Sequence, residues 1–525
     1  MARSLFPIIL AACLLLPRLG DRPYWGDEME DFNFIHRILE RGLPDMTGAF
    51  GGGALQTNSR GWHVYHSWAP LYENALAVRY GGWDNEFLFR LPMVLFALAS
   101  VWGMGLLARE LGQRGGWAQA FFVLSPFFLV PSRLGRYYGA SLCCTVFLLH
   151  AYLRLRRGLA GWPAGLWLVI FFHHNMMHAA ALAIGLVLHW LCTGRPHVAS
   201  AAKATALVAV LLLPWVWWLE LGGGSGGFSV GTLVRQAPKT LWLVLAGFWS
   251  APLIAWVILR RRELGVLPGL ALSVLIPLSV FISASNHVAP STRYLLPLLP
   301  LGALAMGRFF ESPLKSGSLR VGLALLLVFT NVAHLIPLGL IHLCPLEKME
   351  AYGRKGSDAV RFFSATATPR FLVLAHLGEL VRGCQDPSVD LREALLKAGY
   401  KQGELVSLVT VSSRDEARQV PLANKEKSLT VTTSASGASS DTRYFLTQAM
   451  FYIYGGLPGE MIPQDFQFDP EAPWQVVGPG AEPEPGGRLV AVTDNPPGFW
   501  PDGPDPFNRR YTTEKGEGFR IYRKP

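Results

Sequence analysis

Charged residues are scarce in this chain. They account for 16% of its 525 residues, whereas hydrophobic residues account for 51% and the mean hydropathy is +0.28. Soluble globular proteins carry about 25% charged residues, so this composition excludes an ordinary soluble fold for most of the chain. Apolar runs of bilayer-spanning length recur up to about residue 343 and then stop. We therefore expect a membrane part followed by a soluble tail.

Signatures of nucleotide, metal and nucleic-acid binding are also missing. The glycine-rich run 48–53 follows no strand and contains no Gly-Lys-Ser/Thr, so it is not a phosphate loop, and the sequence has no Rossmann fingerprint. The six cysteines show no metal-ligand spacing. No module combining basic and aromatic residues for nucleic-acid binding is visible. We therefore expect neither a nucleotide cofactor nor a nucleic-acid partner.

The basic residues that do occur belong to the membrane part. Residues 344–525 hold 21 Lys and Arg against 23 Asp and Glu, so the net charge of +10 comes from residues 1–343. In a membrane protein such an excess is typical of cytoplasmic loops that face anionic lipid.

Eleven apolar segments predict a polytopic α-helical membrane protein. They are 4–20, 87–108, 117–131, 138–153, 162–173, 176–192, 203–220, 239–259, 264–284, 292–309 and 320–342. Basic residues cluster in every second connection, which places the N-terminus in the cytoplasm and, with an odd number of spans, places the loop 21–86 and the tail outside. We expect the plasma (inner) membrane. The first segment is alternatively a cleaved signal peptide, although Pro17–Gly20 offers no small-residue cleavage site; loop 21–86 lies outside in both cases.

The tail, residues 346–525, predicts a small extracytoplasmic α/β domain. Its strand-like runs are 370–374, 488–492 and 519–522, and its helical stretches lie near 355–365 and 390–400. The tail contains no recognisable catalytic constellation. Acceptor recognition or packing on the membrane part, residues 1–345, is therefore its expected role.

The first outer loop begins with a cluster of acidic residues. Asp27, Glu28, Glu30 and Asp31 occupy the first turns of a predicted amphipathic helix over 27–42. Capping and the helix dipole account for one or two acids at this position but not for four. Adjacent carboxylates just outside a bilayer are costly, which makes this helix the first place to look for chemistry. A second short helix is expected at about 70–80, where Pro70 suits a helix start.

Several short outer connections contain arginine against the topology rule. Arg133 and Arg136 lie in Ser132–Tyr138, and Arg293 lies between Thr292 and Tyr294. Binding of an anion is one reason for such exceptions. Snorkelling of the side chains to lipid headgroups is the alternative.

The order of these motifs resembles the GT-C superfamily of polyprenyl-phosphate-sugar-dependent glycosyltransferases. Over residues 1–345 the chain is most similar to the protein O-mannosyltransferase and aminoarabinose (lipid A) transferase branch. The matching features are the short first span, Asp27-Glu28 at the start of a loop helix, a segment from His66 to Tyr72, Phe89–Pro92, Leu124–Phe127, Ser132–Tyr137 and Arg293–Pro297. The usual His-Pro-Pro-Leu reads His66–Leu71 here, with extra residues between the histidine and the proline.

The resemblance implies a glycosyltransferase that works on the outer face. It would transfer a hexose or pentose from a polyprenyl-phosphate carrier to a lipid, glycan or protein acceptor. Asp27, with Glu28 beside it, would be the catalytic base. The residues implied in binding the substrate and the lipid phosphate are Arg133, Arg136, Tyr137, Arg293, Tyr294 and His66.

Such a reaction needs a carboxylate to activate the acceptor hydroxyl and arginines to neutralise the leaving phosphate, in a single inverting displacement. It predicts that Asp27 and Arg293 converge, and it requires no cofactor. A divalent cation held by Asp27, Glu28 and Asp31 is an alternative. A zinc site at His174 and His178 is a further alternative. For the function of the whole chain, the alternatives are a flippase of lipid-linked sugars and a non-catalytic scaffold.

Overall fold

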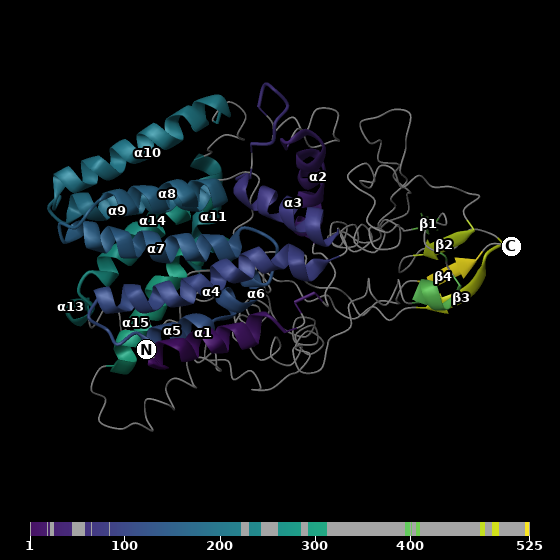
Figure 1. Cartoon of the computed structure of the whole chain (residues 1–525), viewed down its shortest axis with the longest axis horizontal. Helices are drawn as coiled ribbons and strands as arrows, with labels where there is room; N and C mark the ends of the chain where they lie inside the picture. Colours follow the sequence, from purple (N-terminus) through teal and green to yellow (C-terminus); the bar gives the residue numbers. More distant parts are fainter. Residues whose placement is uncertain are drawn as a thin grey trace.

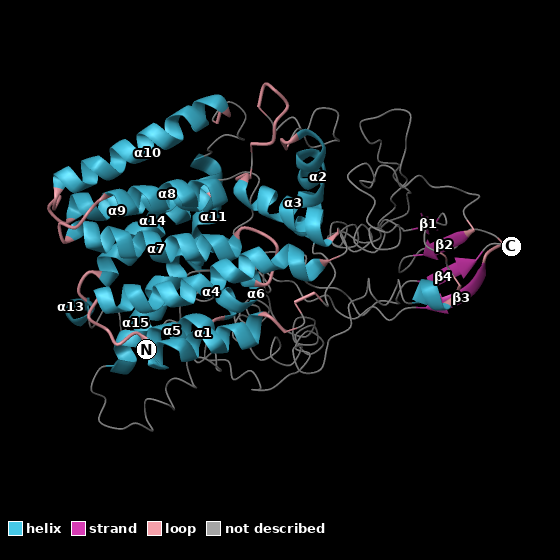
Figure 2. Ribbon diagram, viewed as in Figure 1, coloured by secondary structure: helices cyan, strands magenta, loops and turns pink. Residues whose placement is uncertain are grey.

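Helices make up most of the described structure, and four short strands form a separate sheet (Figure 1). The computed structural model describes residues 2–17, 19–20, 26–44, 58–64, 66–82, 85–221, 230–242, 261–284, 292–311, 394–399, 401, 406–409, 473–477, 486–492 and 520–523. The helices gather in one bundle and the strands lie apart from it (Figure 2).

The described helices of the bundle lie between residues 2 and 311. Their bounds are α1 Ala2–Leu15, α2 Gly26–Arg41, α3 Ala69–Gly81, α4 Glu86–Glu110, α5 Gly116–Val123, α6 Pro126–Ser132, α7 Tyr138–Arg156, α8 Trp162–His174, α9 Met176–Cys192, α10 Val198–Trp218, α11 Val230–Trp242, α13 Arg261–Leu264, α14 Leu267–Ala284, the 3-10 helix η3 Thr292–Leu298 and α15 Leu299–Glu311.

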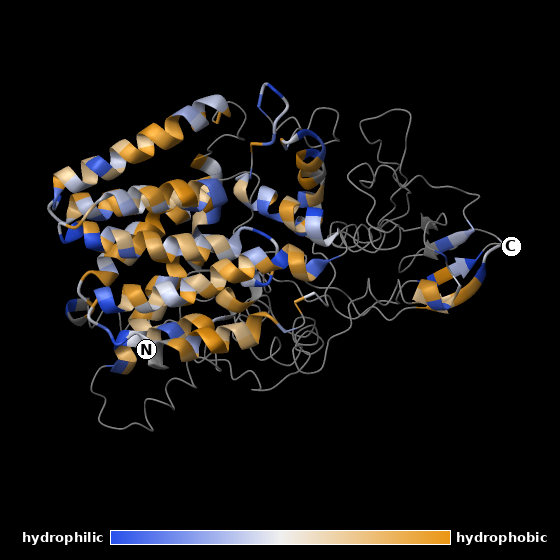
Figure 3. Cartoon of the chain, in the orientation of Figure 1, coloured by the Kyte–Doolittle hydropathy of each residue, from blue (hydrophilic) through white to orange (hydrophobic). Residues whose placement is uncertain are grey.

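The core of the bundle forms where α4 packs along α7. Most side chains of α7 are buried, because α4, α8 and η3 surround it. Gly139 permits the close approach of α7 to α4, since a Cβ at this position would lie 2.1 Å from the carbonyl oxygen of Met93. Hydrophobic residues run along the bundle helices and hydrophilic residues gather near their ends (Figure 3). This pattern suits a bundle whose middle lies in a bilayer.

Three described helices, α4, α7 and α10, are long and apolar enough to span a membrane. Shorter apolar helices occur at Leu5–Leu15, Met176–Cys192 and Leu267–Ser283. Helix α10 packs on α8 at the edge of the bundle and leaves large apolar side chains such as Trp217 exposed, as a lipid-facing helix would. Eleven spans stay a prediction, because the segment 320–342 and most of 239–259 lie outside the described residues.

Two predicted spans are interrupted. The segment 117–131 forms two helices, α5 and α6, because Pro126 lacks the N–H needed to continue the first. The segment 292–309 begins as the 3-10 helix η3 and becomes α-helical only from Leu299, with Pro297 at the junction. Both breaks bring backbone turns to the same end of the bundle, since η3 contacts α6 and α7.

The loop 21–86, which is predicted to lie outside, contains the two predicted helices. Helix α2, predicted over 27–42, runs from Gly26 to Arg41, and α3, predicted over about 70–80, runs from Ala69 to Gly81 with Pro70 in its first turn. The apolar face of α2 packs against α3 and the start of α4 in one small core formed by Phe32, Phe34, Ile35, Ile38, Leu71, Ala75 and Phe89. This core attaches the loop helices to one end of the bundle.

The tail contains a four-stranded mixed sheet in the order β1-β2-β4-β3. Its strands are β1 Val406–Val409, β2 Trp474–Val477, β3 Arg488–Val492 and β4 Arg520–Arg523, with β1 parallel to β2 and the other pairs antiparallel. The predicted strands 488–492 and 519–522 are confirmed, and a short helix occupies 394–397. The predicted elements 355–365 and 370–374 lie outside the described residues. In Figure 1 the sheet lies beyond the end of the bundle that carries α2 and α3.

Candidate functional site

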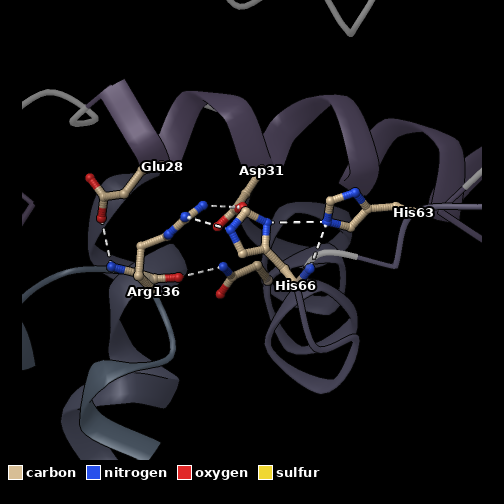
Figure 4. Close-up of polar contacts among 7 residues, drawn as sticks. Glu28, Asp31, His63, His66 and Arg136 are labelled. Atoms are coloured by element: carbon tan, nitrogen blue, oxygen red, sulfur yellow. Dashed lines mark hydrogen bonds and ion pairs between the residues drawn. The ribbon is translucent and has the colours of Figure 1, made fainter. Parts of the chain in front are cut away.

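Two acidic residues of α2 point at the turn that joins α6 to α7. Glu28 and Asp31 are three residues apart and therefore share one face of the helix. Glu28 is 0% exposed and Asp31 is 3% exposed. Buried carboxylates require charged or hydrogen-bonding partners, and both have arginines. Figure 4 shows the contact between Asp31 and Arg136.

Glu28 is held by Arg90 from the first turns of α4. Arg90 Nε donates to Glu28 Oε1 at 3.0 Å and Arg90 Nη2 donates to Oε2 at 2.8 Å, which is the two-pronged geometry of an arginine–carboxylate pair. Arg90 Nη1 also donates to the carbonyl of Leu19, just after α1. Glu28 Oε1 in addition accepts the backbone N–H of Gly135 at 2.6 Å. The pair therefore ties α2, α4 and two connections together.

Asp31 is paired with Arg136. The distance from Arg136 Nη1 to Asp31 Oδ1 is 2.5 Å, and both side chains are 4% exposed. Arg136 Nη2 lies 3.4 Å from His66 Nε2, and its guanidinium lies over the ring of Tyr137 at 5.6 Å. One arginine thus joins a carboxylate, an imidazole and a phenol ring at the N-terminal end of α7.

The two histidines of the loop form a directed chain with Arg136. The Nε2 atom of His63 accepts the backbone N–H of His66 at 3.1 Å, so the Nδ1 atom of His66, also 3.1 Å away, acts as the donor between the two rings. The Nε2 atom of His66 is then left to accept from Arg136. Burial, followed by the charge of Arg136, lowers the pKa of His63 to about 3, so this ring is neutral at physiological pH.

Three residues of the predicted binding set lie at this turn in different surroundings. Arg136 and Tyr137 come together with His66, whose ring centroid is 6.4 Å from that of Tyr137. Arg133 instead points at the end of α1, where its Nη1 donates to the carbonyls of Leu14, Leu15 and Pro17 at 2.9–3.1 Å. The contacts of Arg133 are those of a helix C-cap.

The predicted meeting of Asp27 with Arg293 stays a prediction. Asp27 lies in α2 one turn before Asp31, and Arg293 lies in η3, but both side chains are outside the described structure. Tyr294, also in η3, is buried. The 3-10 helix η3 contacts α6 and α7, which flank the Arg136 turn.

The histidines considered for zinc have other partners. His174 Nε2 lies 2.9 Å from Glu73 Oε1 of α3, and His178 Nδ1 lies 2.9 Å from Asn175 Nδ2. Among the described residues no group of three metal-binding side chains gathers. Glu28 and Asp31, two of the three acids considered for a cation, contact arginines instead.

Sequence reasoning assigned no role to Arg90, His63 or Asn74. Asn74 of α3 is buried and donates to the carbonyl of Gly135 at 2.6 Å. A signal existed for Arg90, because an arginine inside an apolar stretch must find a buried partner. His63 and Asn74 gave none, since their contacts depend on how α2 and α3 fold back.

No family model matches the sequence, and no curated protein matches it significantly. The fold is similar to that of ArnT from Cupriavidus metallidurans bound to undecaprenyl phosphate, with a TM-score of 0.51 and 13% identity over 99% of this chain and 97% of that chain. Apo ArnT gives a TM-score of 0.48 at 14% identity, covering 98% of this chain and 95% of that chain. AglB of Archaeoglobus fulgidus, an archaeal oligosaccharyltransferase, gives 0.35 at 12% identity, covering 70% and 59%. The first similarity shows that this chain shares the fold of that ArnT structure over nearly the whole length of both chains.

Proposed function

We propose that this GT-C-like chain is an integral-membrane glycosyltransferase that transfers a sugar from a polyprenyl-phosphate carrier to an acceptor hydroxyl on the extracytoplasmic face. The observation that carries the proposal is the fold shared over nearly the whole length of both chains with a protein that binds undecaprenyl phosphate. The arrangement of an acidic helix against an arginine turn at one end of the bundle supports it.

The membrane orientation that we propose follows from which elements lie at each end of the bundle. One end is the end that carries α2 and α3. Helices α2 and α3, the arginine turn and the tail sheet all lie toward it (Figure 1). The α1 N-terminus and the arginines that end α7 lie toward the other end, which the positive-inside rule assigns to the cytoplasm of the plasma (inner) membrane. The reactive groups would then face the outside.

The chemistry we assign is a single inverting displacement. The acceptor oxygen forms a bond to the anomeric carbon as the bond from that carbon to the phosphate oxygen breaks. The acceptor proton goes to a carboxylate, and the departing polyprenyl phosphate takes the bonding electrons as a second negative charge. An arginine beside the phosphate stabilises that charge most where water is excluded.

The residues divide between these tasks by their contacts. Both oxygens of Glu28 are engaged by Arg90, so we assign the base role to Asp27 alone. Arg136, held by Asp31, is our candidate for the phosphate, with His66 and Tyr137 beside it. Arg293 and Tyr294 are proposed to complete the site from η3. No metal or cofactor is needed for this reaction.

The test is transfer by purified full-length protein. It is incubated with a panel of polyprenyl-phosphate sugars and candidate acceptors, and released polyprenyl phosphate is measured by mass spectrometry. Asp27→Asn should lower turnover by about 10²–10⁴-fold because the base is lost, while binding of the lipid carrier persists. Glu40→Gln is the matched control, because Glu40 is an exposed acid at the far end of the same helix. Equal turnover in the two variants would refute the assignment of Asp27, and a flippase would move the carrier without releasing it.

A further inference from the structure

Gly135 is held by hydrogen bonds at both of its backbone groups. Its N–H donates to Glu28 Oε1 and its carbonyl accepts from Asn74 Nδ2, each at 2.6 Å. Because peptide units are planar, these bonds fix the two planes on either side of the Gly135 Cα. The next residue, Arg136, therefore starts from a backbone with little freedom (Figure 4).

The groups that grip Gly135 are themselves immobilised. Glu28 and Asn74 are both 0% exposed, and Arg90 binds both oxygens of Glu28. They come from different helices, α2 and α3, which share the small outer core. The position of the Gly135 backbone is therefore set by the docking of both loop helices onto α4.

Only glycine fits at this point. A Cβ at Gly135 would lie 2.1 Å from the Phe89 ring, which is buried and stacked on Phe32 with a centroid distance of 5.1 Å. The close approach lets the backbone of the turn reach Glu28. Helix α2 thus contacts the turn twice, through Glu28 at the Gly135 amide and through Asp31 at the Arg136 guanidinium.

We infer that Glu28 and Asn74 are positioning residues that act through the Gly135 backbone to hold the Arg136 guanidinium at the place where the carrier phosphate binds. This inference rests on the proposed function, in which Arg136 meets that phosphate. Glu28 has no part in proton transfer here; its carboxylate serves as a fixed acceptor for an amide.

A double-mutant cycle between Asn74→Ala and Arg136→Lys separates positioning from general loss of structure. If Asn74 acts through Arg136, N74A should lower kcat by about 10- to 100-fold in the wild-type background, the cost of a small misplacement of a reacting group. In the R136K background the same change should cost less than about twofold. An equal loss in both backgrounds would overturn the inference.

Asn58→Ala is the matched control. The Asn58 amide also donates to a backbone carbonyl, that of Leu219 at 3.2 Å, but it does not contact the Gly135 turn. N58A should change turnover by the same factor with and without R136K. Glu28→Gln, which keeps an oxygen for the Gly135 N–H, should retain more turnover than Glu28→Ala. The reverse order would contradict the positioning role of Glu28.

A second cycle needs no substrate and distinguishes the two proposals. N74A and Asp31→Asn are combined, and the thermal unfolding midpoint of each variant is measured in detergent. If the hydrogen bonds to Gly135 hold Arg136 against Asp31, the double variant should lower the midpoint by clearly less than the sum of the two single variants. Additive decreases in the midpoint overturn the positioning role of Asn74, whether or not the protein transfers sugar. Absence of turnover with every donor overturns only the proposed function.

Discussion

The two ends of the helical bundle carry the same kind of ion pair in opposite surroundings. Arg90 and Glu110 lie near the two ends of α4, about 30 Å apart along the helix. Arg90 pairs with Glu28 at 2.8 Å, where the side chains are 4% and 0% exposed. Glu110 pairs with Arg157 at the same distance, where the side chains are 17% and 59% exposed.

This difference shows that the distance between the charged atoms does not by itself indicate how much an ion pair stabilises the fold. A solvated arginine such as Arg157 loses little when its partner is removed, because water replaces it. A buried pair leaves a charge with no compensation when one member is removed, so it fixes the relative position of the elements that carry it. The proposed outer end is therefore built to hold its charges in place, while the other end is not.

The largest effect should come from removing one arginine at each end. Arg90→Ala removes the arginine from the buried Glu28 carboxylate, at a cost of about 3–5 kcal/mol. Arg157→Ala should cost about 0–1 kcal/mol. The measurement is the thermal unfolding midpoint of each variant in the same detergent. Similar midpoints for the two would remove the distinction between the ends.

A second comparison sets a crowded glycine against an open one. Gly135→Ala forces a methyl group into the Phe89 ring and should destabilise by about 1–3 kcal/mol, the range for overpacking. A Cβ added at Gly116, at the start of α5, would have nothing within 4 Å, so Gly116→Ala should be close to neutral. Unfolding midpoints measure both, and a neutral G135A would contradict the close approach of the turn to α4.

The smallest effects should be in pH dependence, where two histidines at the proposed outer end contribute to stability with opposite pH dependence. Burial alone would lower the pKa of His174, but the hydrogen bond and charge of Glu73 and a hydrogen bond to Ile170 raise it overall. Its folded pKa is thus above the ordinary value of 6.5. The stabilisation is fully present below pH 6.5 and is lost as the pH rises through the folded pKa. Glu73→Gln should therefore reduce the decrease of the unfolding midpoint with rising pH above pH 6.5.

His63 should act on the acidic side. Its pKa is lowered to about 3 by burial and by Arg136, so the folded state resists protonation while the unfolded state accepts a proton below pH 6.5. Stability should therefore decrease as the pH is lowered from 6.5 to 3, and His63→Asn should reduce that decrease. The measurement is the unfolding midpoint as a function of pH. A profile of the variant that runs parallel to that of the wild type would show that His63 does not contribute.

Local sequence patterns predicted the two helices of the loop 21–86 correctly. Helix α2 was predicted over 27–42 from apolar spacing and α3 over about 70–80 from Pro70, and both are confirmed within one residue at each end. The interrupted segments were harder, because Pro126 and Pro297 stand inside apolar runs that hydropathy alone treats as continuous.

Site residues divided according to how far their partners lie along the chain. Asp27 and Glu28 were chosen as neighbours, yet only the fold shows that Glu28 faces Arg90, 62 positions away. Arg133 and Arg136 seemed equivalent by spacing, but one caps α1 and the other meets Asp31. The role of each arginine depends on which helix end the turn reaches, and no periodicity encodes that.

The sequence by itself determined that this is a chain of apolar helices with basic ends and an acidic loop helix, because hydropathy, helical period and proline act over a few residues. Only the tertiary structure decided which acid is engaged by which arginine and which glycine must stay a glycine. Those choices join α2, α3, α4 and the turn after α6 across 61 to 107 positions, and they exist only once packing removes water from between them.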